Sequence, residues 1–237
     1  MIMKDEFKPV IGLITHSSFV PEKEFHECLP QDVHVVTTRL AIKNVTYDGV
    51  QEMISRLPEA VETIMVSAPS VITITSMSGS CMMGERMTNP LEQQSGVPVL
   101  SPAVEAVKLL KQLGCRDIIM ICLLGTELGF LEKYFFGKNE INMIKIINII
   151  ENFDGRLNQV DMIDTEEVME KISRIDFNGA QAVIFDSPAV QFVKLAERLE
   201  SMINIPILSS NQILMYAALK RIGISTEGLY IHKFFTQ

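Results

Sequence analysis

The sequence predicts an α/β protein whose two similar halves each hold a doubly wound parallel sheet. Short runs rich in valine and isoleucine alternate with longer helical patterns along the chain, as in 117–124 followed by 126–137. The apolar runs are continuous, which is typical of strands buried on both faces of a parallel sheet. Alternation of strands and helices then implies right-handed crossovers and a doubly wound arrangement.

The strands are short Val/Ile-rich runs bounded by Gly, Pro or Ser, and the helices are the longer amphipathic segments between them. In chain order, strands are expected at 9–15, 33–40, 71–77, 98–102, 117–124, 143–150, 182–187 and 206–210. Helices are expected near 22–29, 47–66, 102–113, 126–137, 165–175, 188–202 and 211–221.

An internal similarity supports the two halves. GVPVLSPAVEAVKLLKQLG (96–114) resembles NIPILSSNQILMYAALKRIG (204–223), and each is a strand ending in Ser followed by a helix that stops at Gly. Any two strand–Ser–helix units look somewhat alike, but two similar halves explain the match better. We expect one half to cover 1–103 plus 213–237 and the other to cover 104–212.

Composition excludes several classes of protein. With 47% hydrophobic and 21% charged residues, the 237-residue chain has the balance of a globular protein. A net charge of −8 without a basic cluster argues against nucleic-acid or membrane-surface partners, and no apolar run approaches the ~18 residues of a membrane span. Four cysteines without a CxxC pair, and an N-terminus without a signal-peptide profile, predict a cytoplasmic protein with reduced thiols.

Metal and phosphate sites are not expected. The only local cluster of ligand types, His26-Glu27-Cys28, lacks the spaced pairs that a zinc site needs. Neither GxGxxG nor GxxxxGK[ST] occurs in the sequence.

Hydroxyl-bearing residues gather where the expected strands end. Ligands of such sheets bind beyond the carboxyl ends of the strands, and hydroxyls with free N–H groups at helix N-termini favour anions. Each residue alone is explained by a plain helix cap, but several converging loops favour a pocket for a small carboxylate. The residues at these ends are His16, Ser17, Ser18, Ser76, Met77, Ser78, Gly79, Ser80, Leu124, Thr126, Asp186, Ser187, Ser209, Ser210 and Asn211.

Three segments carry a family resemblance. ILSSNQILMYAALKRIGI (207–224) is a strand followed by Ser-Ser-Asn-Gln and a helix, TTRLAIKNVTYDGVQEMI (37–54) contains Thr-Thr-Arg and a Thr-x-x-Gly helix start, and TSMSGS (75–80) is a hydroxyl-rich loop. Together they resemble the aspartate/glutamate racemase superfamily, most closely its maleate isomerase and arylmalonate decarboxylase branch. The similarity covers nearly the whole chain.

The resemblance implies a site between two pseudosymmetric halves, no cofactor and, by analogy, a homodimer. The family forms an enolate-like carbanion beside a carboxylate, in isomerase, racemase or decarboxylase chemistry, or adds a thiolate across an activated double bond. Two cysteines stand on opposite faces of the substrate, and hydroxyls and N–H groups hold its carboxylate. A developing enolate needs such preorganised donors, and a thiol with a pKa of ~8.5 can give and take a proton near neutrality.

This sequence departs from the family pattern at both cysteines. Aligning Ser-Gly-Ser (78–80) places Ser76 at the first cysteine, and aligning AVIFDSPAV places Ser187 at the second. Cys81 falls where the family carries an apolar or aromatic residue, which favours a packed cysteine over a nucleophile. The resemblance implies four further departures. Ser18 and Gly129 stand where the family has asparagine, Leu124 where it has tyrosine, and Met77 where it has threonine.

Two hypotheses follow for the function. Serine is a far weaker acid than a thiol, so Ser76 and Ser187 need a partner base. His16 is the histidine at a strand end and is the expected acid/base group, with Glu127 as a second candidate. The chain is then either an enzyme with altered proton-transfer groups or a catalytically inactive homologue that binds a carboxylate. Engineered Cys→Ser replacement is a third explanation, but it does not account for the other departures.

Under either hypothesis, the ligand is a small mono- or dicarboxylic acid. The residues expected to bind it are Ser17, Ser18, Met77, Ser78, Gly79, Ser80, Leu124, Thr126, Ser209, Ser210 and Asn211.

Overall fold

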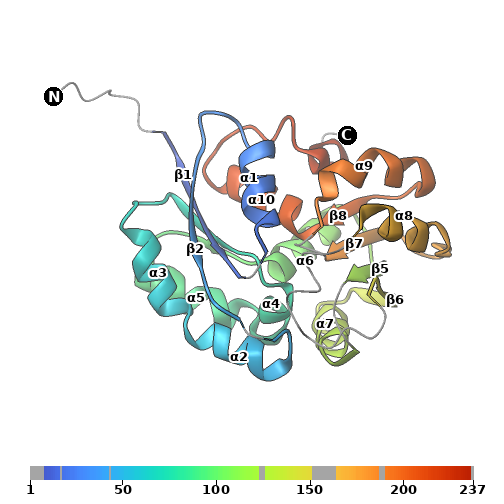
Figure 1. Cartoon of the computed structure of the whole chain (residues 1–237), viewed down its shortest axis with the longest axis horizontal. Coiled ribbons are helices and arrows are strands. Elements are labelled where there is room, and N and C mark those ends of the chain that lie inside the picture. The colour runs from blue at the N-terminus through green and yellow to red at the C-terminus, as the bar shows by residue number, and fades with distance from the viewer. Residues whose placement is uncertain are drawn as a thin grey trace.

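The chain folds into two four-stranded parallel sheets flanked by helices, as the computed structural model in Figure 1 shows. The structure describes residues 8–16, 18–42, 44–122, 126–150, 164–186 and 190–235, with only the backbone of 126 and 127. The first sheet has the order β2-β1-β3-β4 and the second the order β6-β5-β7-β8. Because the two orders correspond strand for strand, the predicted α/β class with two similar halves is confirmed.

The strands lie close to their predicted positions. Those of the first sheet are β1 (Val10–Thr15), β2 (His34–Arg39), β3 (Val71–Ile74) and β4 (Val99–Leu100). Those of the second are β5 (Asp117–Cys122), β6 (Asn142–Asn148), β7 (Ala182–Asp186) and β8 (Ile207–Ser209). Every residue of β3 and β7 is buried, whereas the edge strand β2 is partly exposed. The continuous apolar runs therefore mark the inner strands.

Ten α-helices and a short 3₁₀ helix are found among the described residues. They are α1 (Val20–Cys28), α2 (Tyr47–Ser55), α3 (Leu57–Met65), α4 (Met77–Met83), α5 (Glu85–Ser95), α6 (Pro102–Gln112), α7 (Thr126–Lys138), α8 (Thr165–Ser173), α9 (Phe192–Met202), α10 (Ser210–Arg221) and the 3₁₀ helix Tyr230–Phe234.

The single helix predicted near 47–66 is divided into α2 and α3. Arg56 ends α2 and begins α3. Pro58 lies in the first turn of α3, where its missing N–H group costs no helical hydrogen bond. The residue before a proline is disfavoured in a continuing helix, which places the break here.

The predicted strand 71–77 is shorter, and the hydroxyl-rich stretch after it is helical. β3 ends at Ile74, and α4 and α5 follow with Gly84 between them. Gly84 has a φ of 56°, which glycine adopts without steric cost, so one helix ends there and the next begins. The sequence analysis missed both helices because serine and glycine favour loops when they are considered singly.

The two segments that resemble each other in sequence pack together in the fold. α6 and α10 lie between the two groups of strands (Figure 1). One buried core cluster includes side chains of both helices and of strands from both sheets, such as Leu13 of β1 and Met120 of β5. The predicted boundaries near residues 103 and 212 fall in the first turns of these helices, and the division itself stays a prediction.

Candidate functional site

Arg39 at the end of β2 fixes the loop that follows β1. Its guanidinium donates to the backbone oxygens of His16, at 3.2 Å, and of Ser18, at 2.9 Å. The same group pairs with Glu22 on α1. The Ser18 hydroxyl accepts the N–H of Val20 at 3.1 Å and so supports the start of α1. The Thr-Thr-Arg segment of the family resemblance thus positions the loop that carries the predicted acid/base histidine.

His16 is neutral rather than cationic in its buried environment. Its Nδ1 is buried and has no hydrogen-bond partner among the described residues. Burial lowers the pKa of His16 to about 4, because the charged imidazolium loses hydration. The ring is therefore neutral near pH 7, and burial disfavours its protonation.

Ser76 begins α4 and shapes its first turn. Its hydroxyl oxygen accepts the N–H of Gly79 at 3.1 Å, as in other serine N-caps. A Cβ on Gly79 would lie 2.9 Å from Ser76 Oγ and 3.1 Å from the Met53 side chain, so any larger residue would have to displace the capping hydroxyl. Met77 is buried in the core cluster shared by the sheets. The Ser76 O–H group thus remains a donor for a ligand while its oxygen holds the turn.

Ser80 connects α4 to α6. It is fully buried, and its hydroxyl lies 2.7 Å from the hydroxyl of Ser101. Its oxygen also accepts the N–H of Ala103 at 3.1 Å. Within the described structure, the Ser80 side chain therefore already has two polar partners, and its predicted ligand role stays a prediction.

Ser78 of α4 contacts the buried carboxyl of Glu132, which lies on α7 between two strands of the second sheet. Its hydroxyl donates to Glu132 Oε1 at 3.1 Å. Glu132 is fully buried on α7, one helical turn from Leu128 and one from Phe136 on the same apolar stripe. Its second oxygen, Oε2, has no hydrogen-bond partner in the described part of the chain. Burial, followed by the nearby charge of Asp186, raises the pKa of Glu132 well above its usual range.

Asp186 forms the second buried carboxyl of this cluster. It is the last residue of β7 and accepts a hydrogen bond from the side chain of Ser210 in the first turn of α10. Burial raises its pKa to about 7, and its Oδ1 has no hydrogen-bond partner among the described residues. Ser78, Glu132, Asp186 and Ser210 therefore form one buried polar group between α4 and α10, which we call the carboxyl cluster.

Asn211 and Glu24 make a second polar contact across the molecule. Asn211 Nδ2 donates to Glu24 Oε2 at 2.7 Å, and the N–H of Val193 donates to Glu24 Oε1 at 3.2 Å. Burial raises the pKa of Glu24 to about 7, against the opposing effect of these hydrogen bonds. Ser209 accepts the N–H of Gln212 at 3.2 Å and caps α10. The predicted 209–211 segment is thus held in place from α1 and α9.

Several predicted positions lie outside the described structure. Ser17, Leu124 and Ser187 are not among the described residues, and only the backbone of Thr126 and Glu127 is described. The other predicted site residues lie at the ends of β1, β3 and β8, the edge of the sheets where ligands of such folds bind.

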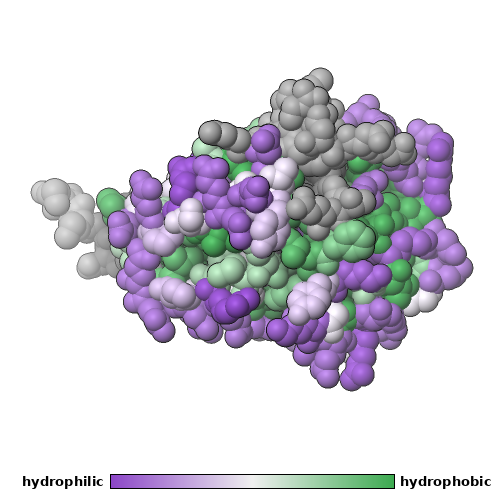
Figure 2. Space-filling view, turned by 90° about the horizontal axis from the view of Figure 1, so that it is seen from below, coloured by the Kyte–Doolittle hydropathy of each residue, from purple (hydrophilic) through white to green (hydrophobic). Residues whose placement is uncertain are grey.

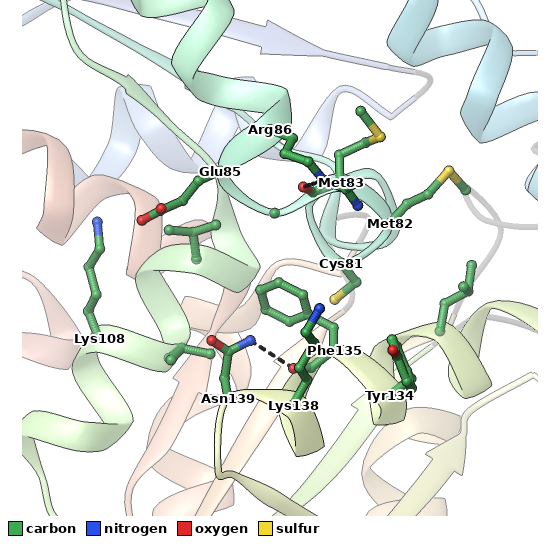
Figure 3. A pocket seen from close by; sticks show the side chains of 14 residues that line it. Cys81, Met82, Met83, Glu85, Arg86, Lys108, Tyr134, Phe135, Lys138 and Asn139 are labelled. Atoms are coloured by element: carbon green, nitrogen blue, oxygen red, sulfur yellow. Dashed lines mark hydrogen bonds between the residues drawn. The ribbon is translucent and has the colours of Figure 1, made fainter.

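Cys81 lies between the carboxyl cluster and a surface pocket of about 540 Å³. The pocket opens between α4, α6 and α7, and Figure 3 shows the Cys81 side chain pointing from α4 toward Phe135. Burial, then the charges of Glu132 and Asp186, raise the thiol pKa well above its usual range. The thiol is therefore protonated near neutral pH, as expected for a packed cysteine.

The described residues contain no group of three or more His, Cys, Asp or Glu side chains arranged to hold a metal ion. Among the same residues, no helix is both long enough and apolar enough to cross a membrane.

Comparison with known proteins decides the family. The arylmalonate decarboxylase family model matches residues 12–235. The chain belongs to this family. As a member of the arylmalonate decarboxylase family, it is 25% identical over 224 residues to the maleate isomerase of Alcaligenes faecalis, covering 92% of this chain and 86% of the relative. This confirms the branch that the sequence resembles.

Solved structures of arylmalonate decarboxylase family relatives share the fold. Nocardia farcinica maleate cis-trans isomerase bound to TRIS superposes with a TM-score of 0.85 at 19% identity, covering 93% of this chain and 96% of that one. A liganded double mutant of arylmalonate decarboxylase gives a TM-score of 0.79 at 17% identity, with 91% and 93% covered. A cysteine-to-alanine variant of maleate isomerase from Pseudomonas putida S16 with maleate gives a TM-score of 0.78 at 14% identity, with 94% and 99% covered.

The sequence analysis assigned no role to the carboxyls that the structure brings into contact with predicted site residues. Glu132 lies at the middle of the buried stripe Leu128–Glu132–Phe136, and Glu24 lies beside Phe25 on the buried face of α1. A charged residue at a core position of a helix was the available signal, since unpaired glutamate is rarely buried. Asp186 had been placed at a strand end without a role.

Proposed function

We propose that this member of the arylmalonate decarboxylase family is an enzyme that acts on a small mono- or dicarboxylic acid without a cofactor. The reaction proceeds through an enolate-like intermediate, in isomerase, racemase or decarboxylase-type chemistry. The carboxyl cluster is the observation that carries this proposal, because it joins predicted site residues of α4 and α10 through two buried acids. Buried ionisable groups with strongly shifted pKa values are typical of catalytic sites.

The proposed roles follow the family resemblance. Ser76 and Ser187 replace the two cysteines on the faces of the substrate, and His16 is the accompanying proton acceptor. The substrate carboxylate is held at the starts of α4 and α10, where Ser76 and Ser209 cap the helices. Maleate and arylmalonate, which the relatives' names contain, are both small dicarboxylates, and this supports the substrate class.

A carboxylate-binding homologue without activity is the second candidate. Ser76 and Ser209 accept backbone N–H groups as ordinary helix caps do, and the Ser80 side chain is occupied by Ser101 and Ala103. These contacts favour a rigid binding pocket and supply no proton carrier at Ser76, the first proposed cysteine position.

Anion binding tests what both candidates share. We expect maleate, malonate or sulfate to raise the melting temperature of the protein, and Asn211→Leu to reduce this shift. Asn89→Leu, at an exposed position of α5, is the matched control and should keep the parental shift. A parent that responds to none of the anions contradicts both candidates, and α-proton exchange in deuterated water then separates enzyme from binder.

We also propose a homodimer, as the family resemblance implies. Figure 2, which views the molecule from below, shows apolar residues gathered between polar ones. Phe130 and Tyr134, one turn apart on α7, are 73% and 70% exposed, which supports burial against a second copy. Sedimentation equilibrium of the parent and of Phe130→Glu tests this, and a monomeric parent contradicts it.

A further inference from the structure

The carboxyl cluster has unused hydrogen-bonding capacity at its centre. Glu132 uses Oε1 to accept from Ser78, and Asp186 accepts from Ser210. Glu132 Oε2 and Asp186 Oδ1 are buried and have no hydrogen-bond partner within the described structure. Leaving buried polar oxygens without partners is costly, so these two atoms indicate a place that a ligand or a transferred proton can occupy.

The surroundings of the two acids favour one shared proton. The groups that act on Glu132 are Asp186 and Ser78, and Ser210 acts on Asp186. The thiol pKa of Cys81 is raised first by burial and then by the charges of the same two carboxyls, so Cys81 is a third titratable group near the pair. Two adjacent buried carboxyls do not both ionise, because their charges repel at low dielectric. One carboxyl is then a base while the other is an acid, which is the arrangement that two-way proton transfer requires.

The position of the pair relates it to the proposed site. Asp186 directly precedes Ser187, and Ser78 lies two residues after Ser76. Asp186 is thus next in the chain to the second of the positions at which the family resemblance places its cysteines, and Glu132 is linked to the segment of the first through its hydrogen bond from Ser78. Both acids come from the second sheet's strands and connections, whereas Ser78 comes from the first.

We propose that Asp186 and Glu132 are the acid/base couple that moves a proton at the α-carbon of the bound acid, in place of the two thiols. The proposal rests on the proposed function and narrows its proton-transfer groups and its substrate class. The Asp186 carboxylate takes the α-proton, and the C–H electron pair becomes the C=C bond of the enediolate. The Glu132 carboxyl then gives its proton to that carbon, and the proton on Asp186 passes back to Glu132 to restore the couple.

The same couple serves decarboxylation of a malonate-type acid. The bond between the α-carbon and one carboxylate breaks, carbon dioxide leaves, and the electron pair of that bond forms the C=C bond of the enediolate. Glu132 then protonates the α-carbon and is reprotonated from solvent. Thiolate addition to maleate is not a reaction that two carboxyls supply. The substrate class is therefore an acid with a hydrogen or a second carboxylate on its α-carbon.

Isosteric variants test the couple directly. Glu132→Gln keeps the side-chain size and the oxygen that accepts from Ser78, and Asp186→Asn keeps the size of Asp186, but neither amide can transfer a proton. The readouts are α-proton exchange of succinate and 2-phenylpropionate in deuterated water and carbon dioxide release from phenylmalonate. We expect Glu132→Gln to lose at least about 100-fold in both reactions that the parent shows, and Asp186→Asn to lose as much in α-proton exchange only. Malonate should still raise the melting temperature of both variants. Glu105→Gln removes a carboxyl that pairs with Lys108 and should keep the parental rate.

Each outcome distinguishes this inference from the proposed function. Folded variants that exchange the α-proton at the parental rate overturn the couple and leave the proposed function standing. A parent that reacts with none of the three probes overturns both. The parent's own pH profile needs no variant: its rate of α-proton exchange should rise through the pKa of Asp186, about 7, because the base form takes the α-proton. A rate that is flat across this range contradicts the couple even if the variants do not fold.

Discussion

The Ser78 hydroxyl and the Glu132 carboxyl lie 3.1 Å apart and connect the two sheets of the molecule. Ser78 belongs to α4, between β3 and β4, and Glu132 belongs to α7, between β5 and β6. A similar contact joins Glu24 of α1, between β1 and β2, to the N–H of Val193 of α9, between β7 and β8. Since β1 corresponds to β5 and β3 to β7 in the sheet orders, the two glutamates play equivalent parts.

The equivalence ends at the free oxygens. Both oxygens of Glu24 have hydrogen-bond donors, from Asn211 and Val193. Glu132 has one donor, from Ser78, and a buried oxygen without a partner among the described residues. Glu24 therefore fits the part of a structural clamp, and Glu132 has capacity left for chemistry.

Ser78→Ala should destabilise the fold by about 1–3 kcal/mol, because it leaves a buried carboxyl oxygen without its donor. Urea unfolding at neutral pH measures the change. Ser67→Ala is the control, since Ser67 is exposed, and it should alter the free energy of unfolding by less than about 0.5 kcal/mol. Equal stability of the two variants contradicts the importance of the contact.

Gly79→Ala should destabilise α4, because its new Cβ would lie 2.9 Å from Ser76 Oγ and 3.1 Å from the Met53 side chain. Gly137 in α7 is the matched position, as a Cβ there meets nothing within 4 Å. Gly137→Ala should be neutral or should stabilise by up to about 1 kcal/mol, the helix-propensity gain. Thermal melts compare them, and a Gly79→Ala variant as stable as the parent contradicts the predicted clash.

Glu24 should make stability fall as pH rises. Its pKa rises from 4.5 to about 7 on folding, so its contribution is fully present below about pH 4.5 and is lost as pH increases through about 7. Glu24→Gln removes this titration and should reduce the loss of stability between about pH 5 and about pH 8 by roughly 2 kcal/mol. Urea unfolding at both pH values measures it, and an unchanged pH dependence contradicts the raised pKa.

The strand positions were predictable because buried parallel strands are continuous Val/Ile runs, as in β5 and β7. The Thr46 cap of α2 was also visible in the Thr-x-x-Gly pattern, and its hydroxyl accepts the N–H of Gly49. The end of β3 was not predictable from the sequence. A serine such as Ser76 is common at the end of a strand, in a loop and at the cap of a helix, so its presence does not distinguish them. Local sequence does not show where a side chain finds its partner.

The carboxyl cluster shows the same limit for the site. The interaction of Ser78 with Glu132 depends on how α4 and α7 pack, at a separation of 54 residues. The sequence marks Glu132 as an acid within an apolar helical stripe, but its partner follows only from the tertiary structure. The family resemblance directed attention to the cysteine positions and not to the acids beside them.

The described cysteines should be unreactive toward iodoacetamide near neutral pH. Cys81 is buried with a raised thiol pKa, and burial raises that of Cys28 to about 11. Alkylation requires the thiolate, so any activity of the parent should survive treatment of the folded protein. Mass spectrometry locates the adducts, with the urea-unfolded chain as the positive control. Rapid inactivation with one adduct at Cys81 contradicts its structural role.

Ser76→Cys combined with Ser187→Cys should raise isomerase or racemase activity above that of the parent. A thiol with a pKa of ~8.5 is a proton carrier near neutrality and a serine hydroxyl is not. Exchange of the α-proton of a bound acid, followed by NMR in deuterated water, reports the chemistry without knowledge of the natural substrate. Ser67→Cys, which adds a thiol at an exposed position, should leave the parental rate unchanged.

The result separates the two functional hypotheses. A parent that already exchanges well, and loses exchange in His16→Ala or Glu132→Gln, is an enzyme with altered proton-transfer groups, and the added thiols matter little. If neither the parent nor the double variant exchanges, proton carriers at both faces are not sufficient. That outcome supports the carboxylate-binding homologue, in line with the departures that the family resemblance implies at Leu124 and Gly129.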